Sequence, residues 1–192
     1  MAGVRSTAAA LRVDASPRSV YVLVLPVTLG HTMSLRLEDI ELIKRVKHKY
    51  FRSIDMGDIK ALEDLFVPDV QVCYIGGTYR WELKGRTPLL ASIAAAFNSN
   101  SVGCHTGHHP EIDVLTDTTA VGTWYLTDIY LNLVEQTRTT GSALYQDRYI
   151  KEDGRWRICE TTYTRVYEQV EKLPEPPTLT AHHLANVPPP KA

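Results

Sequence analysis

Cysteine is scarce in this sequence, and positive and negative charges nearly balance. The three cysteines, Cys73, Cys104 and Cys159, are scattered along 192 residues and form no CxxC pair. An odd number of isolated cysteines argues against a disulfide framework and against a zinc knuckle, so we expect reduced thiols in a cytoplasmic protein. The formal net charge of −1 gives no reason to expect binding to nucleic acid or to an anionic membrane.

A long apolar run is also missing near the N-terminus, where the most hydrophobic stretch lies. The run Val20–Leu29 is too short for a transmembrane helix, which needs about 20 apolar residues, and Pro26 interrupts it. It follows a basic stretch, as in a signal sequence, but no clear small-x-small cleavage site comes after it. We therefore predict that residues 1–33 form a disordered N-terminal extension. The alternatives are a secreted protein and a functional start at Met33.

Length and composition fit one soluble domain with tails. Hydrophobic residues make up 44% and charged residues 22% of the chain, which is ordinary for a globular protein. A chain of 192 residues can bury a core without a disulfide or a structural metal. We predict a domain over residues 34–170 and a proline-rich tail over residues 171–192 that forms no regular structure.

Hydrophobic spacing predicts three helices. The expected helices run from an N-cap at Ser34 to Gly57, from a cap at Asp58 to Pro68, and from a cap at Thr87 to Phe97. Apolar residues recur every three or four positions in the first of them, and Tyr50 lies on that apolar stripe. In the second, the stripe consists of Leu62, Leu65 and Phe66.

Alternating apolar residues predict two short strands and then four long ones. The short pair lies around Val70–Tyr74 and Tyr79–Leu83; the long strands lie near Gly103–Leu115, Thr119–Leu131, Thr139–Lys151 and Gly154–Tyr167. The resulting order of helices and strands predicts an α+β fold, in which three helices cover a strongly bent mixed or antiparallel sheet. Such a cone-shaped hollow suits a small apolar ligand.

Asp128 is the first candidate for chemistry. By the strand period of two, Trp124, Leu126, Asp128 and Tyr130 share one face. A carboxyl group buried in such company has a raised pKa and can act as a general acid. The opposite face, which carries Tyr125, is also apolar, and its burial would leave Asp128 in solvent. Periodicity does not choose between the two faces.

Three histidines, His105, His108 and His109, lie in the stretch HTGHHPE. Histidine is the side chain best suited to accept a proton near pH 7. Two of the three could share a strand face, which raises the hypothesis of a metal site. No further close-spaced His, Cys or carboxylate completes a tetrahedral ligand set, so we expect no metal. An ordinary core or surface histidine is the competing interpretation.

Tyr50 and Asp55 lie on the first predicted helix. The hydroxyl of Tyr50 should point inward and needs a hydrogen-bond partner there, which a backbone carbonyl could also supply. Asp55 lies near the C-terminus of that helix, where the helix dipole disfavours a negative charge. It is therefore either paired or functional, unless it is simply a turn residue before Gly57. Asp147 lies between Tyr145 and Tyr149 on one strand face and is a weaker version of the Asp128 case.

Four sequence segments together resemble a known family. They are IKRVKHKYFRSIDMGD, CHTGHHPEI, GTWYLTD and YQDRYIKEDGRWRICETTYTR, and the resemblance spans Leu37–Glu168. In this order they resemble the SnoaL-like family of the cone-shaped α+β barrel superfamily, and within it the bacterial bile-acid 7α-dehydratases. Two positions depart from that pattern, because His109 replaces a threonine-like residue and Thr127 an acidic one.

The resemblance implies a catalytic set, which consists of Tyr50, Asp55, His105 and Asp128. We further expect the substrate pocket to include Tyr74, His108, Trp124, Tyr145 and Asp147. The implied reaction needs no cofactor and eliminates water from a hydroxy-ketone or enone of a steroid or polyketide, that is, from a small apolar polycyclic substrate. The resemblance also implies a homotrimer or homodimer.

Each implied catalytic residue has an expected role. His105 would take the acidic proton, and Tyr50 would hydrogen-bond the developing oxyanion or the leaving oxygen. Asp128 would orient His105 or pass a proton to the departing hydroxyl, and Asp55 would hold Tyr50 or a water molecule in place. The same set could instead shift a double bond, as ketosteroid isomerases do, or serve a polyketide cyclase. A non-catalytic ligand-binding protein is the remaining alternative.

Overall fold

Three α-helices and six strands make up the fold in the computed structural model, which describes residues 35–190. The helices are α1 (Leu37–Asp55), α2 (Ile59–Glu63) and α3 (Arg86–Ala96), with a 3-10 helix, η1 (His183–Asn186), near the end. The strands are β1 (Phe66–Ile75), β2 (Arg80–Lys84), β3 (Ser101–Val114), β4 (Thr119–Asn132), β5 (Thr137–Glu152) and β6 (Arg155–Lys172). None of the helices in this part of the chain is both long and apolar enough to span a membrane. The predicted N-terminal extension and the Ser34 N-cap lie outside the described residues.

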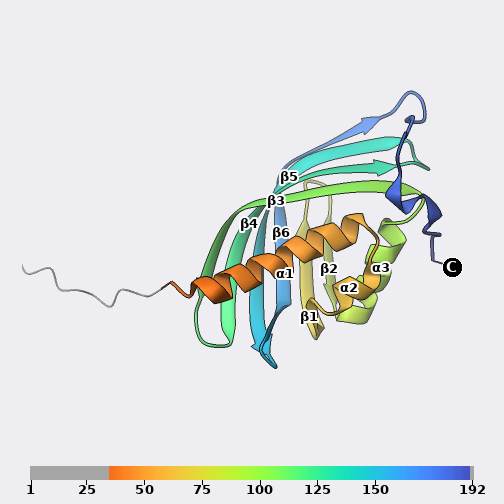
Figure 1. Cartoon of the computed structure of the whole chain (residues 1–192). Helices are drawn as coiled ribbons and strands as arrows, with labels where there is room; N and C mark the ends of the chain where they lie inside the picture. The colour runs from red at the N-terminus through yellow and green to blue at the C-terminus, as the bar shows by residue number, and fades with distance from the viewer. Residues whose placement is uncertain (1–34, 191–192) are drawn as a thin grey trace, which may run out of the picture. The chain divides into compact units, whose positions relative to one another are not determined.

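The six strands form one mixed sheet in the order β2-β1-β6-β5-β4-β3. Strands β1 and β6 are parallel, and the other neighbouring strands are antiparallel. Figure 1 shows the long strands curving, with α1 inside the curve against β3 and β6. This bent, open sheet with three helices confirms the predicted α+β class and the predicted order of helices and strands.

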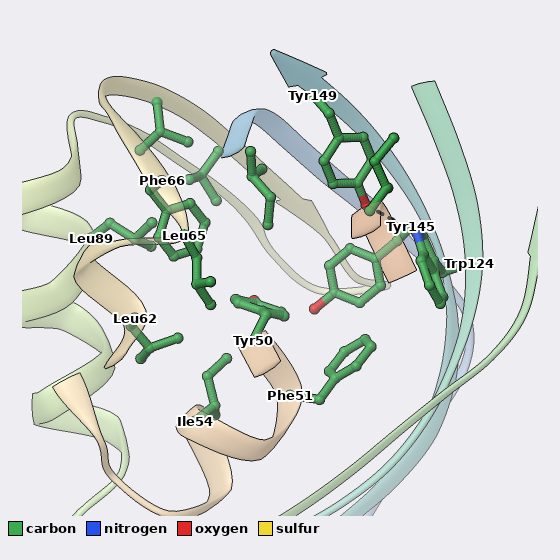
Figure 2. Close-up of a cluster of buried hydrophobic side chains, with 14 of the residues drawn as sticks. Tyr50, Phe51, Ile54, Leu62, Leu65, Phe66, Leu89, Trp124, Tyr145 and Tyr149 are labelled. Atoms are coloured by element: carbon green, nitrogen blue, oxygen red, sulfur yellow. Dashed lines mark hydrogen bonds between the residues drawn. The ribbon is translucent and has the colours of Figure 1, made fainter. Parts of the chain in front are cut away.

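The core lies between α1 and the concave face of the sheet. Tyr50 on α1 is buried there, and Trp124, Leu126 and Asp128 on β4 are buried opposite, whereas the residues between them point outward and are exposed. Figure 2 shows Tyr50 meeting Tyr145 of β5 within this core. The question that periodicity left open is thereby answered, since the face of β4 that carries Asp128 is the buried one.

A glycine allows β3 to come close to α1. A Cβ atom at Gly107 would overlap the ring of Phe51, so no larger residue fits there without moving that ring. Phe51 in turn stacks on His105, with ring centroids 6.3 Å apart and planes 14° apart. The close approach therefore brings His105 within reach of the C-terminal end of α1.

Two predicted helix boundaries were wrong. The second helix ends at Glu63, and Phe66 already belongs to β1, because its backbone pairs with Ile158 of β6. The apolar stripe that suggested a longer helix is thus shared between a helix and a strand. The third helix begins at Arg86 instead of after Thr87, because Gly85 precedes it with a φ of 102°, a conformation that glycine adopts without strain.

The C-terminal segment packs against the domain, although beyond the end of β6 its described residues form no regular structure except η1. Strand β6 continues to Lys172, where it pairs with Thr137 of β5. Beyond it, Leu184 of η1 is buried, and Ser99 N–H donates a 2.7 Å hydrogen bond to the carbonyl of Val187. The proline content did not predict this packing. One buried leucine and a few backbone hydrogen bonds are enough to anchor the segment.

Candidate active site

A cavity of about 420 Å³ opens between the concave face of the sheet, α1 and α3. Aromatic and aliphatic side chains make most of its wall, and polar groups enter from α1 and from β1, β3, β4, β5 and β6. The residues that carry these groups include Tyr50, Tyr74, His105, Asp128, Tyr145, Tyr163 and Arg165. A mostly apolar cavity with a few convergent polar groups is the usual form of a small-molecule site.

Asp55 and His105 form a pair at one side of this cavity. The Nδ1 atom of His105 lies 2.5 Å from Oδ1 of Asp55, and the backbone N–H of His105 donates to Oδ2 at 2.9 Å. Because a carboxylate only accepts, the ring proton is on Nδ1 and Nε2 is left as the basic nitrogen. The two hydrogen bonds also offset the unfavourable position of Asp55 at the C-terminus of α1. Asp55 was expected to hold Tyr50 or a water molecule, but its carboxylate holds His105, and the hydroxyl of Tyr50 pairs with that of Tyr74 instead.

Asp128 is buried opposite His105 in the β3–β4 register, but its carboxylate is paired with Arg165 of β6. Both terminal nitrogens of the guanidinium contact it, and the Nη2–Oδ2 distance is 2.9 Å. Burial alone would lower the pKa of Arg165, but its hydrogen bonds to Asp128 and Tyr79 raise it overall, so the cation persists. Asp128 is therefore an ion-paired carboxylate, and no hydrogen bond joins it to His105 within residues 35–190. Of the two alternatives that the sequence left open, Asp128 is on the buried face, but it is not the isolated acid that burial there was expected to give.

Buried tyrosines form the wall beside this pair. The hydroxyls of Tyr50 and Tyr74 lie 2.9 Å apart, and Tyr163 stacks on Tyr74 at a centroid distance of 4.3 Å. Figure 2 shows the hydroxyl of Tyr145 directed toward Tyr50. Burial raises the pKa of Tyr50 and raises those of Tyr74 and Tyr145 further, so these phenols stay protonated and can donate hydrogen bonds.

A buried ion pair lies behind Tyr145, outside the cavity. Lys47 is fully buried, and its Nζ lies 2.8 Å from Oδ2 of Asp147 and 3.5 Å from the centroid of the Tyr145 ring. Asp147 also accepts hydrogen bonds from Thr161 and from Tyr149, each at 2.7 Å. The carboxylate is thus fully engaged by its neighbours, and the expectation that Asp147 lines the substrate pocket is not met.

Two other predicted pocket residues lie elsewhere. His108 is on the outer face of the sheet, where its ring stacks on Tyr125 at 5.6 Å, because it is three residues from the inward-facing His105 in an unbroken stretch of β3. Trp124 is completely buried beneath the cavity wall, and its indole N–H donates to Tyr149 at 3.1 Å (Figure 2). Tyr74 and Tyr145 do line the cavity. In the described part of the chain, no three His, Cys, Asp or Glu side chains are grouped so as to hold a metal.

Arg165 and Tyr163 are site residues that sequence reasoning missed. They are two residues apart on β6, so their side chains share one face of the strand, and both line the cavity. A signal was present, because an arginine two residues from a tyrosine on a buried strand face needs an acidic partner. That partner, Asp128, is 37 residues away, so only the sheet order could reveal the pair.

Comparison with solved structures shows which proteins share this fold. A candidate scytalone dehydratase from Novosphingobium aromaticivorans is 23% identical, with a TM-score of 0.60, over 69% of this chain and 87% of that chain. A hexachlorocyclohexane dehydrochlorinase from Novosphingobium barchaimii is 14% identical, with a TM-score of 0.61, over 71% and 92%. A protein of unknown function from Mycobacterium tuberculosis is 24% identical, with a TM-score of 0.53, over 67% and 72%.

At these identities the likeness concerns the fold alone. The family assignment comes from the sequence, since residues 35–162 match the SnoaL-like domain and make up more than half of the chain. The chain therefore belongs to the family of SnoaL-like domains.

Proposed function

We propose that this protein is a lyase that eliminates water from a β-hydroxy ketone or related enone without a cofactor. The observation that carries the proposal is the Asp55–His105 pair, which presents an oriented imidazole at a cavity whose other wall is made of phenols. An imidazole held by a carboxylate is a general base, and phenol hydroxyls are donors for a developing oxyanion.

The reaction follows from this geometry. Nε2 of His105 removes the proton from the carbon next to the carbonyl, and the electron pair moves onto the carbonyl oxygen as an enolate. The hydroxyls of Tyr50 and Tyr74 are buried and protonated, and one of them donates to the other. The remaining proton of this pair is the one that can stabilise that oxygen. The enolate then re-forms the carbonyl and expels the β-hydroxyl, which takes the proton from His105 and leaves as water. Asp55 stabilises the imidazolium between the two proton transfers.

The substrate class is part of the proposal. Stacked tyrosines and aliphatic side chains of α3 make a broad apolar cavity, and its volume falls within the range of about 300–1,000 Å³ that is usual for ligand pockets. This supports a polycyclic ketone, either a steroid or an aromatic polyketide. The resemblance of four sequence segments to bile-acid 7α-dehydratases favours the steroid. Solved proteins of the same fold are named for related eliminations, the loss of water and the loss of hydrogen chloride.

We expect the purified protein to convert at least one hydroxy-ketone steroid or polyketide into a product lighter by one water. The measurement is mass spectrometry of a substrate panel after incubation, with His105→Gln as the control that should give no product. A product of unchanged mass with a moved double bond would instead assign an isomerase. Tight binding of panel members without any conversion would contradict the lyase and leave a ligand-binding protein.

A further inference from the structure

Arg165 raises the question of whether the cavity binds an anionic ligand. It is the only lysine or arginine in the cavity wall, as far as residues 35–190 define it. A guanidinium in an apolar cavity commonly binds a carboxylate or phosphate of the ligand. Whether it does so here depends on which protein groups already occupy its donors.

Two carboxylates already occupy this guanidinium. Asp128 contacts both terminal nitrogens, and Oε2 of Glu168 lies 2.9 Å from Nε. All three side chains are largely buried, with exposed fractions of 9% for Arg165, 5% for Asp128 and 18% for Glu168. One cation facing two anions leaves this end of the cavity with an excess of negative charge, which screening by solvent reduces little at such burial.

The guanidinium is also fixed in place. Its carbon lies 5.3 Å from the centroid of the Tyr163 ring, and Nε lies 3.4 Å from the hydroxyl of Tyr79. The hydroxyls of Tyr79 and Tyr163 are themselves 2.7 Å apart. A Cβ atom at Gly141 would lie 2.8 Å from Nη1, so β5 packs directly against the group. Arg165 therefore has no room to turn toward a ligand without giving up its carboxylate partners.

We infer that the cavity takes an uncharged ligand, and that Glu168 is the residue that excludes anions by occupying Arg165. The inference rests on the proposed function only in taking this cavity as the ligand site. It narrows the proposed substrate to a ketone that carries no charged group. Glu168 is a positioning residue, because it contacts Arg165 and does not form the cavity wall. A carboxylate-bearing ligand would meet the negative charges of Asp128 and Glu168, and the single positive charge of Arg165, already outnumbered by them, would not compensate a third anion.

The test compares two ligands that differ only in charge, a steroid carboxylic acid and its methyl ester, by isothermal titration calorimetry near neutral pH. We expect the wild-type protein to bind the ester at least about tenfold more tightly than the acid. Glu168→Gln keeps an oxygen for Nε and removes the charge. We expect it to strengthen binding of the acid about tenfold and to leave the affinity for the ester nearly unchanged.

The matched control is Glu160→Gln. Glu160 is on the same strand, but its carboxylate is 46% exposed and faces Arg148 outside the cavity, so the protein loses the same charge without a change near Arg165. Its ratio of ester to acid affinity should equal that of the wild type. Three results would overturn the inference: an acid that binds the wild type as well as the ester does, an unchanged ratio in Glu168→Gln, or no binding of either ligand. Because binding is measured without turnover, a protein that selects the ester but converts no substrate would refute only the lyase.

Discussion

The Asp55→Asn protein should remain folded and lose about 10²–10⁴-fold in kcat for the elimination. In the wild type, one carboxylate oxygen accepts from the backbone N–H of His105 and the other from its Nδ1. An asparagine would keep its oxygen on the backbone N–H and turn its NH2 group toward Nδ1. The proton of the imidazole would then move to Nε2, and the nitrogen that should act as the base would be blocked.

The measurement is kcat with any hydroxy-ketone that the wild type converts, together with the urea unfolding curve of both proteins. Asp58→Asn is the matched control, because Asp58 is an exposed carboxylate just beyond the same helix end, and asparagine also caps helices well. It should keep wild-type activity. An Asp55→Asn protein with undiminished kcat would remove Asp55 from the mechanism, and one that loses activity only by unfolding would make its role structural.

Lys47→Met should reduce the free energy of unfolding by about 3–5 kcal/mol, the usual cost of leaving one partner of a buried ion pair alone. Methionine fills a similar volume against Tyr145, so packing changes little. The loss arises at Asp147, whose negative charge would stay buried without its cation. Hydrogen bonds from Thr161 and Tyr149 remain, but they do not replace a full positive charge.

Urea unfolding monitored by circular dichroism measures this loss. Lys44→Met is the control on the same helix, since Lys44 is partly exposed and its Nζ lies 3.7 Å from Oε2 of Glu41. This variant should change the free energy of unfolding by less than about 0.5 kcal/mol. The double variant Lys47→Met with Asp147→Asn should recover most of the loss, because it removes both charges and keeps the acceptor oxygen. A single Lys47→Met as stable as the wild type would show that the pair contributes nothing.

Local patterns in the sequence were sufficient for the fold class and for the order of the helices and strands. Helical spacing placed Tyr50 on the inner stripe of α1, and alternation placed the long strands, because burial on one face imposes a period that the sequence must follow. The same alternation could not decide whether Asp128 faces inward. That choice depends on which face of β4 lies against α1, which is a property of the assembled sheet.

Local sequence patterns could not predict which residues pair with one another in the site. Asp55 and His105 are 50 residues apart, so the helix-dipole argument indicated that Asp55 needed a partner without identifying it. The ion pair of Asp128 with Arg165 was not predicted for the same reason, since 37 residues separate the two. His108 was misplaced for another reason: it was matched to the family pattern, although strand alternation puts it on the face opposite His105, three residues away.

The central claim is that Nε2 of His105 removes the proton next to the carbonyl of a bound ketone. The most direct measurement is exchange of that proton with D2O, followed by NMR, in a ketone that binds the protein and lacks the β-hydroxyl, so that elimination cannot occur. We predict rapid exchange at the carbon next to the carbonyl with the wild type and only the buffer rate with His105→Gln. Exchange at the buffer rate with the wild type, for a ketone that calorimetry shows to be bound, would contradict the account.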